Sequence, residues 1–324
     1  MRVTRRLILR LVPGLAAGPA AARAEAYPGR AIRLIVPFAP GGPTDVMARV
    51  LAAGFGGAFG QPVVVENRGG GGGNIGVAAA ARAAPDGYTL LVTSTGFVVN
   101  PSLFRNPGYD PVRDFAPITE LGASPNVILA TAQSGIGSVA DLVARARVQP
   151  GGLDLANPGT GSTPHLTAEL LQLAAGIRFV QVPHASAALA VQSLLANTTP
   201  VGITALPPAQ PHIRSGAFRA LAITGAERWP DLPEVPTMLE LGYPGFVSET
   251  FQGLLAPAGT PPAIIRRLEA AARAVLAEPT TAGRLRAAGF GLRGGGPEGL
   301  ADRIAREVPY WRDLIRRAGI PQEG

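Results

Sequence analysis

Residues 40–45, Pro-Gly-Gly-Pro-Thr-Asp, are the stretch of this chain whose residue types are best suited to binding chemistry. They follow an apolar segment at 32–38 and precede a pattern of helical spacing. Gly41 and Gly42 permit a tight turn and leave no side chain over their N–H groups. Thr44 or Asp45 is predicted to cap the helix. Such a turn suits an anion such as a carboxylate, and a plain strand-to-helix connection is the alternative interpretation.

A second polar turn, residues 157–164, reads Asn-Pro-Gly-Thr-Gly-Ser-Thr-Pro and precedes a helix predicted at 165–175. Ser162 is expected to cap this helix, and its hydroxyl is also a donor for a ligand. His165, at the start of the same helix, is a further candidate for ligand contact. No G-x-S-x-G pattern surrounds Ser162, so the sequence has no nucleophile elbow here.

Five consecutive glycines at 69–73 lead into Asn74-Ile75-Gly76, and residues 71–76 formally match G-x-G-x-x-G. The context argues against a dinucleotide site. Residues 66–68 separate the preceding strand from the glycines, and no acidic residue follows about 20 positions on to hold a ribose. We therefore expect no cofactor, and the run is either another anion-facing turn or a flexible connection.

The chain offers little for catalysis. Its histidines are His165, His184 and His212, and no two of them have metal-ligand spacing. It contains no Cys, so thiol chemistry and disulfides are excluded. No paired carboxylates and no Ser-His-Asp order are present. The sequence predicts a ligand-binding protein rather than an enzyme, and it predicts no metal site.

Strand and helix patterns alternate along most of the chain. Alternation of this kind predicts a mostly parallel, doubly wound α/β sheet. A chain of 324 residues favours two lobes, and the lack of a linker suggests that strands cross between them as hinges. Pro309 is expected to kink the last helix. Strands are predicted at 62–66, 88–93, 127–132, 153–156, 179–182, 201–204, 219–224 and 253–257, and helices at 75–84, 139–148, 165–175, 264–277 and 301–318.

The composition, 47% hydrophobic and 16% charged, is that of a folded globular protein. All 29 basic residues are Arg, and the net charge is +7. The arginines are scattered and few aromatic residues accompany them, so no nucleic-acid partner is expected. No run approaches the roughly 18 uncharged apolar residues of a membrane span.

The N-terminus resembles an export signal. Residues 4–10, Thr-Arg-Arg-Leu-Ile-Leu-Arg, are similar to a twin-arginine motif, and a weakly apolar stretch follows at 11–22. Ala22-Arg23-Ala24 has the small-x-small form of a cleavage site, with residues 24–26 as the competing one. We expect residues 1–24 to be a removed signal peptide and the mature protein to be periplasmic. Twin-arginine and Sec export both remain open.

Taken together, ten stretches spread over the chain resemble the Bug-type solute receptors of the tripartite tricarboxylate transporter family. Each stretch is weakly specific by itself, but their order and spacing together are specific. The matching stretches are 27–28 with 32–38, 40–45, 65–76, 85–91, 100–103, 109–115, 159–166, 219–222, 235–237 and 255–261.

This resemblance implies a type II periplasmic-binding-protein fold, an α/β architecture of two doubly wound lobes joined by two crossover strands. Lobe 1 would contain residues 27–124 and 249–324, and lobe 2 residues 125–248. The family implies a small carboxylic acid in the interlobe cleft, held by N–H groups, hydroxyls and waters and delivered to the transporter's membrane subunits. A monomer is expected. The alternatives are a ligand-sensing receptor for a signalling partner and an exported enzyme acting on a carboxylate.

Asp45 is a difficulty for this interpretation, because a carboxylate repels an anionic ligand. We expect it to cap the helix and to position waters. The sequence also departs from the family at 182–186, Val-Pro-His-Ala-Ser in place of Val-Pro-Tyr-Lys/Arg-Gly, and at 196–201, where Gly-Gly-Gln/Glu-Val-Asp is usual. These losses imply a less charged or more apolar ligand, with His184 as a substitute donor. The candidate ligand-binding residues are Pro40, Gly41, Gly42, Thr44, Asp45, Ser94, Thr95, Gly161, Ser162, His165 and His184.

Overall fold

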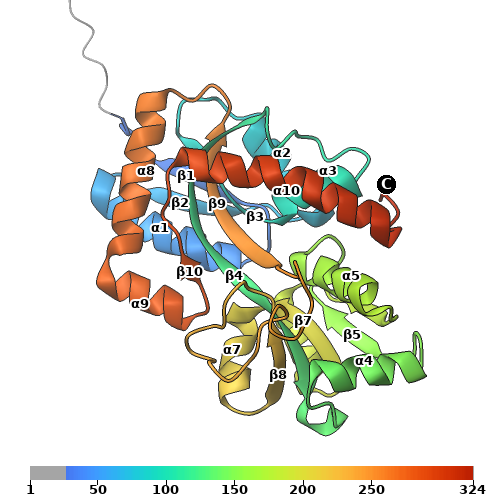
Figure 1. The fold of residues 1–324 in the computed structure, drawn as a ribbon. Coiled ribbons are helices and arrows are strands. Elements are labelled where there is room, and N and C mark those ends of the chain that lie inside the picture. The colour runs from blue at the N-terminus through green and yellow to red at the C-terminus, as the bar shows by residue number, and fades with distance from the viewer. Residues whose placement is uncertain (1–26, 324) are drawn as a thin grey trace, which may run out of the picture.

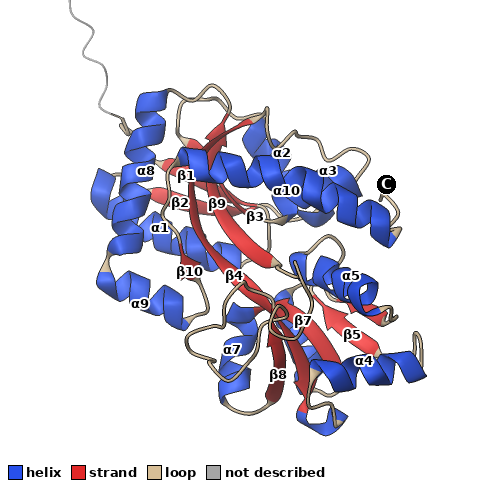
Figure 2. Cartoon of the chain, in the orientation of Figure 1, coloured by secondary structure: helices blue, strands red, loops and turns tan. Residues whose placement is uncertain are grey.

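The computed structural model describes residues 27–323, so the predicted signal peptide at 1–24 lies outside the described part of the chain. Two sheets, each covered by helices on both faces, lie one above the other in Figure 2. This arrangement follows from the alternating apolar strands and amphipathic helices of the sequence.

The first sheet has the strand order β2-β1-β3-β9-β4, with β10 added beside β4. β1, β2 and β3 are parallel, whereas β9 runs antiparallel to both β3 and β4. The strands are β1 (Ile32–Val36), β2 (Val63–Asn67), β3 (Thr89–Ser94), β4 (Phe115–Thr131), β9 (Glu249–Pro257) and β10 (Gly291–Leu292). The helices of this half are α1 (Pro43–Phe59), α2 (Asn74–Ala81), α3 (Gly96–Leu103), α8 (Pro262–Ala277), α9 (Pro279–Ala287) and α10 (Pro297–Ala318).

The second sheet has the order β4-β7-β5-β6, and β8 also pairs with β4. β5 lies parallel to β6 and β7, while β7 and β8 are antiparallel to β4. Its strands are β5 (Asp154–Asn157), β6 (Val180–Pro183), β7 (Val201–Ala205) and β8 (Phe218–Ile223). Its helices are α4 (Val139–Val148), α5 (Thr163–Ala175), α6 (Ala187–Leu195) and α7 (Leu206–Arg214).

β4 belongs to both sheets and joins them, as Figure 1 shows. Residues 115–125 of β4 pair with β9, and residues 126–131 pair with β7 or β8. β9 begins at Glu249, beside this changeover, and returns the chain to the first sheet. The lobe boundaries at 124/125 and 248/249 stay predictions. Three of the four buried clusters lie within one predicted lobe, and the fourth joins lobe 1 to Leu166 of α5.

Several elements differ from the sequence expectations. β4 begins at Phe115 rather than at residue 127, because a strand that serves two sheets continues through residues with no apolar alternation. The sequence missed α3, α6, α7 and α9. Pro101 lies inside α3, and α7 contains Pro207, Pro208 and Pro211, so propensity argued against helices there. α10 begins at Pro297, ahead of the predicted residue 301, and Pro309 lies within it.

Candidate ligand-binding cleft

The predicted site turns lie where parallel strands of the two sheets end. β1 and β3 lead into α1 and α3, and β5 and β6 lead into α5 and α6. The two halves approach closely at this end of the strands. A Cβ placed on Gly161 would lie 2.9 Å from Leu103 Cδ1 of α3. The hydroxyl oxygens of Thr163 on α5 and Thr250 on β9 are 2.6 Å apart. Ligands of open α/β sheets bind at such carboxyl ends.

Asp45 holds the β1–α1 turn together. Its Oδ2 accepts hydrogen bonds from the Gly41 N–H at 2.9 Å and from Arg49 Nε at 2.8 Å. Its Oδ1 accepts from Asn67 Nδ2 at the end of β2, also at 2.9 Å. Burial acts to raise the pKa of this carboxyl, but the hydrogen bonds from Arg49, Gly41 and Asn67 outweigh it and the pKa lies below its ordinary value. Asp45 is therefore an ionised structural centre of the turn.

The prediction that Thr44 or Asp45 caps α1 is wrong. The N-cap is Gly42, which has no side chain to accept from the helix, and Pro43 occupies the first helical position. Asp45 reaches backwards to Gly41 instead, as an acidic residue in the first turn often does. The Gly41 N–H is thus already engaged, and the N–H groups of the first turn of α1, at Thr44 and Asp45, are left without an intrahelical acceptor.

The β5–α5 turn is also held by its own side chains. Ser162 caps α5 as predicted, because its Oγ accepts from the His165 N–H at 3.3 Å. The same hydroxyl donates to the Gly159 carbonyl at 2.7 Å. His165 Nδ1 accepts from the Gly161 N–H at 3.4 Å, and burial lowers the pKa of this imidazole to about 4. His165 is therefore neutral at pH 7 and shapes the turn rather than attracting an anion by charge.

Ser94 and Thr95 lie at the end of β3, but they differ in their contacts. Thr95 is fully buried, and its hydroxyl joins β9 by accepting from the Phe251 N–H at 3.0 Å and donating to the Glu249 carbonyl at 3.3 Å. Ser94 pairs in register with Gln252 of β9. The Thr95 hydroxyl thus connects β3 to the crossover strand, and Ser94 is the better placed of the two for a ligand.

The glycine run packs tightly rather than forming a free loop. Gly70, Gly71, Gly72 and Gly73 all have positive φ, the region that favours glycine. Asn100 Nδ2 of α3 donates to the Gly72 carbonyl at 3.0 Å. A Cβ on Gly72 would lie 3.1 Å from the Phe104 ring. The run therefore allows α3 to approach the β2–α2 connection.

A sequence profile described as TctC, tripartite tricarboxylate transporter family receptor, matches residues 47–320. The chain belongs to this receptor family. Its members are solute-binding receptors, so the prediction of a receptor rather than an enzyme is confirmed, and so is the resemblance seen in the sequence.

Solved structures agree with the fold of the receptor. The periplasmic binding protein BugD is 36% identical, with a TM-score of 0.85, and the match covers 92% of this chain and 100% of BugD. The R. palustris protein Rpa4515 with adipate is 34% identical, with a TM-score of 0.86 and coverages of 92% and 100%. MatC from Rhodopseudomonas palustris with bound malate is 32% identical, with a TM-score of 0.83 and coverages of 89% and 100%. The α/β periplasmic-binding-protein fold is thus confirmed.

His184, at the departure from the family pattern in residues 182–186, lies against the β5–α5 turn. Its N–H donates to the Asn157 carbonyl at 2.8 Å, and its own carbonyl would be 3.0 Å from a Cβ on Gly159. The His184 Nε2 atom is buried and has no hydrogen-bond partner among the described residues. This unpaired ring nitrogen keeps His184 among the candidates for ligand contact.

The second departure, residues 196–201, lies elsewhere. It connects α6 to the amino end of β7, whereas the predicted site turns follow carboxyl ends of strands. Asn197 takes a positive φ of 54°, and its Oδ1 accepts from the Thr131 hydroxyl at 2.8 Å. This turn lies at the opposite end of the strands from the predicted site turns, so its position does not support a contact with the ligand, and its effect on specificity stays a prediction.

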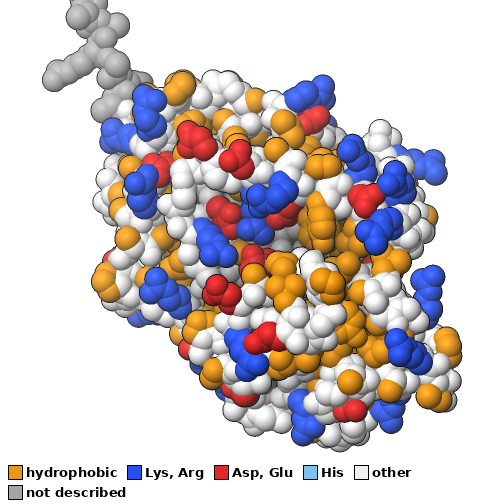
Figure 3. Space-filling model, viewed as in Figure 1, with side chains coloured by type: hydrophobic (Ala, Val, Ile, Leu, Met, Phe, Trp, Pro, Cys, Tyr) orange, Lys and Arg blue, Asp and Glu red, His pale blue; other side chains and the backbone are white. Residues whose placement is uncertain are grey.

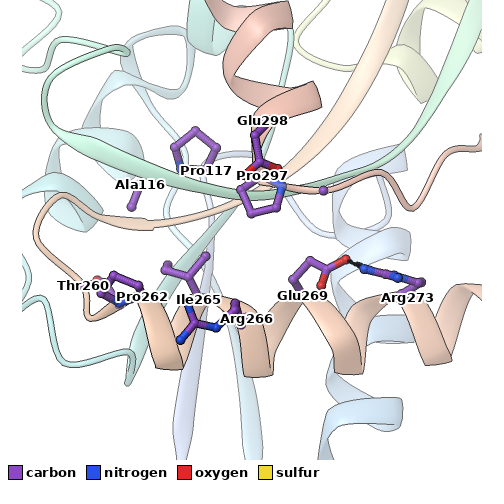
Figure 4. A pocket seen from close by; sticks show the side chains of 11 residues that line it. Ala116, Pro117, Thr260, Pro262, Ile265, Arg266, Glu269, Arg273, Pro297 and Glu298 are labelled. Carbon is purple, nitrogen blue, oxygen red and sulfur yellow. Dashed lines mark hydrogen bonds and ion pairs between the residues drawn. The ribbon is translucent and has the colours of Figure 1, made fainter.

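Two surface hollows do not coincide with the predicted site turns. One, of about 540 Å³, lies between α8 and the starts of β4 and α10, where Glu269 and Arg273 pair beside it (Figure 4). The other, of about 460 Å³, lies between α10 and residues 245–249 and is lined by Arg303 and Glu307 among others. Acidic and basic side chains are interspersed over the face in Figure 3. Neither hollow lies at the carboxyl ends of the parallel strands, so neither is the candidate site.

No group of three or more His, Asp or Glu side chains among residues 27–323 is arranged to hold a metal ion. Among the described helices, none has the length and apolar character needed to cross a membrane.

The sequence did not single out Gln252, a buried amide on β9, because a lone Gln in a strand carries no motif.

Proposed function

We propose that this receptor binds a small carboxylic acid between its two lobes and delivers it to the membrane subunits of a tripartite tricarboxylate transporter. The observation that carries the proposal is that the β1–α1 and β5–α5 turns each start a helix at the carboxyl end of a parallel strand, and that the β5–α5 turn lies against α3 of the other lobe. N–H groups in the first turn of a helix and its positive dipole end favour an anion. Relatives with adipate and with bound malate support a carboxylate.

The roles proposed for individual residues follow from their free groups. Pro40, Gly41 and Asp45 shape the first turn, and the main-chain N–H groups of Gly42 and Thr44 would face the carboxylate. Gly161, Ser162 and His165 shape the second turn. Ser94 and the Nε2 of His184 supply side-chain contacts, and Thr95 joins β3 to the hinge. His184, which replaces a Tyr of the family pattern, would select the part of the ligand beyond the carboxylate.

A ligand screen by thermal shift tests this function on the mature chain without residues 1–24. At 100 times its Kd, a ligand that binds only the folded state stabilises it by about 2.7 kcal/mol. Organic acids, amino acids and aromatic acids are the test compounds, with sugars and nucleotides as the contrasting set. Stabilisation by sugars or nucleotides alone would contradict the proposed ligand class.

Delivery needs a separate test. Uptake of the labelled ligand by intact cells should require both this receptor and the membrane subunits. The proposed export of the chain to the periplasm is tested in the same cells by fractionation and by sequencing the mature N-terminus, which is expected near Glu25 or Tyr27. Normal uptake without the receptor, with loss of a transcriptional response to the ligand, would favour a sensing role instead.

A further inference from the structure

Gln252 on β9 is buried in an unusual way. Its side chain is fully buried, yet neither Nε2 nor Oε1 has a hydrogen-bond partner among residues 27–323. It is the only buried side-chain amide of this part of the chain with both ends unpaired. Each unpaired buried polar group costs about 1–3 kcal/mol, and folded proteins satisfy nearly all of them. Such a group needs a hydrogen-bond partner that residues 27–323 do not supply, either an ordered water or a polar group of a ligand.

The strands beside Gln252 explain why no internal partner reaches it. It pairs in register with Ser94 on β3 and with Gly122 on β4. Gly122 has no side chain, and a Cβ there would lie 2.8 Å from the Gly291 carbonyl of β10. The β4 neighbour therefore offers no side-chain group, and on β3 the register partner of Gln252 is Ser94, whose hydroxyl makes no hydrogen bond to it among the described residues.

Alternation along β9 shows which face of the sheet Gln252 occupies. Leu254 belongs to the buried cluster that includes α1, whereas Phe251 and Leu255 belong to the cluster that includes α10. Because side chains alternate between faces, Gln252 lies on the α1 face. It is two residues nearer than Leu254 to the end of β9 at Glu249, where the chain leaves the other lobe.

Two other polar side chains, those of Ser94 and Thr44, lie at the end of the apolar layer between the first sheet and α1. On β3, Val92 belongs to the cluster under α1, and Ser94 is the next residue on that face and lies at the strand end. On α1, Thr44 precedes Ala48 of this cluster by one helical turn and is 4% exposed. Thr44, Ser94 and Gln252 therefore end the apolar layer on the side of the β1–α1 turn.

We propose that Gln252, with Ser94 and Thr44, forms a subsite for a neutral hydroxyl or amide group that the ligand carries beside its carboxylate. The inference rests on the proposed function and specifies its ligand. A carboxylate only accepts hydrogen bonds, so it cannot satisfy the Gln252 carbonyl. A hydroxyl or an amide both donates and accepts, and it satisfies both ends of Gln252. A site with such paired polar groups rejects analogues that lack the matching group.

The chain offers a matched control in Gln172 of α5. Gln172 is also buried, but its Oε1 accepts from the Phe179 N–H and its Nε2 donates to Glu169 Oε2, both at 2.8 Å. Replacing an unpaired buried amide by an apolar group of similar size is neutral or stabilising, whereas replacing a paired one leaves its partners unsatisfied. Q252L should therefore keep or raise the Tm of the ligand-free protein, and Q172L should lower it.

The experiment measures Tm without ligand and Kd by calorimetry for malate, succinate and adipate, on the wild type, Q252L and Q172L. Malate and succinate differ by one hydroxyl. We expect the wild type to bind malate at least about tenfold more tightly than succinate or adipate. Q252L should abolish this preference by weakening malate about tenfold or more, and Q172L should keep it.

Each other result has a definite meaning. Wild-type protein that binds succinate or adipate as tightly as malate contradicts the hydroxyl subsite but leaves the carboxylate function intact. A Q252L protein that loses Tm as Q172L does, with an unchanged Kd for malate, makes Gln252 a purely structural residue. Failure of the wild type to bind any carboxylate of the wider screen overturns the proposed function itself.

Discussion

Asn126 of β4 donates a hydrogen bond from Nδ2 to the Thr167 hydroxyl of α5, at 2.9 Å, inside the joint between the two lobes. The same amide contacts Ser248 Oγ, and Asn126 Oδ1 accepts from Thr250 on β9. Asn126 is fully buried. One side chain thereby ties both crossover segments to the helix that begins at the cleft, so the joint is ordered by a polar network rather than by apolar packing alone.

Removing the Asn126 amide should weaken this connection between the lobes. N126A should lower the free energy of unfolding by about 2–4 kcal/mol, because it leaves buried hydroxyls without partners. It should also speed hydrogen exchange at residues 248–250. N100A is the control, since Asn100 is buried and its side chain, among the described residues, donates to Gly72 and Asn74 of lobe 1. If both variants speed exchange at 248–250 equally, Asn126 has no special role in the joint.

Asp45 should make the receptor sensitive to acid. Its pKa in the folded state is below the ordinary value, so its stabilisation is complete above pH ~4 and is lost as the pH falls through the folded pKa. D45N should cost about 1–3 kcal/mol at pH 7, by weakening the bonds to Gly41 and Asn67. The stability difference from wild type, measured by denaturant titration, should shrink at pH 3.

R49A is the control for Asp45. Arg49 is 56% exposed, and exposed ion pairs contribute little, so R49A should cost less than about 1 kcal/mol. An R49A cost equal to that of D45N would mean that the ion pair, rather than the hydrogen bonds from Gly41 and Asn67, orders the turn.

His165 gives a second pH dependence, of known sign. Its pKa falls from 6.5 to about 4 on burial, so the unfolded chain takes up a proton in this range that the folded chain does not. The free energy of unfolding should fall as the pH drops from 6.5 to 4, by at most about 3 kcal/mol. H165N removes the titrating group and keeps an acceptor for Gly161, and its stability should lack this component. Equal pH slopes for the two proteins would contradict the assignment.

A substitution at Gly161 tests whether the close approach of the two lobes matters for ligand binding. It has a φ of +79°, and a Cβ there would meet Leu103 Cδ1 at 2.9 Å across the cleft edge. G161A should lose about 1–2 kcal/mol to backbone strain and should also weaken ligand binding in calorimetry. G176A is matched, since Gly176 has a φ of +64° but open space around it. G176A should therefore lose stability with no change in Kd.

Local features were readable from the chain alone, since they depend on nearby residues. The period of apolar residues placed α4 at its observed bounds of Val139–Val148, and Ser162 was correctly expected to cap α5. The family could be read from ordered motifs. The helices with internal proline, α3 and α7, were missed because their stability comes from packing rather than from propensity.

The sequence by itself determined a two-lobed α/β receptor with glycine turns suited to an anion. Tertiary structure decided which polar groups are free, because hydrogen-bond partners come from distant segments. Asn67 of β2 donates a hydrogen bond to Asp45, and the Thr95 hydroxyl donates to the Glu249 carbonyl of β9. The Gly161 N–H donates to the His165 ring. The Gln252 amide is left unpaired in the folded sheet, where its register partner on β4 is Gly122, which has no side chain. No local pattern records that neighbourhood, and it is there that we expect ligand specificity to be set.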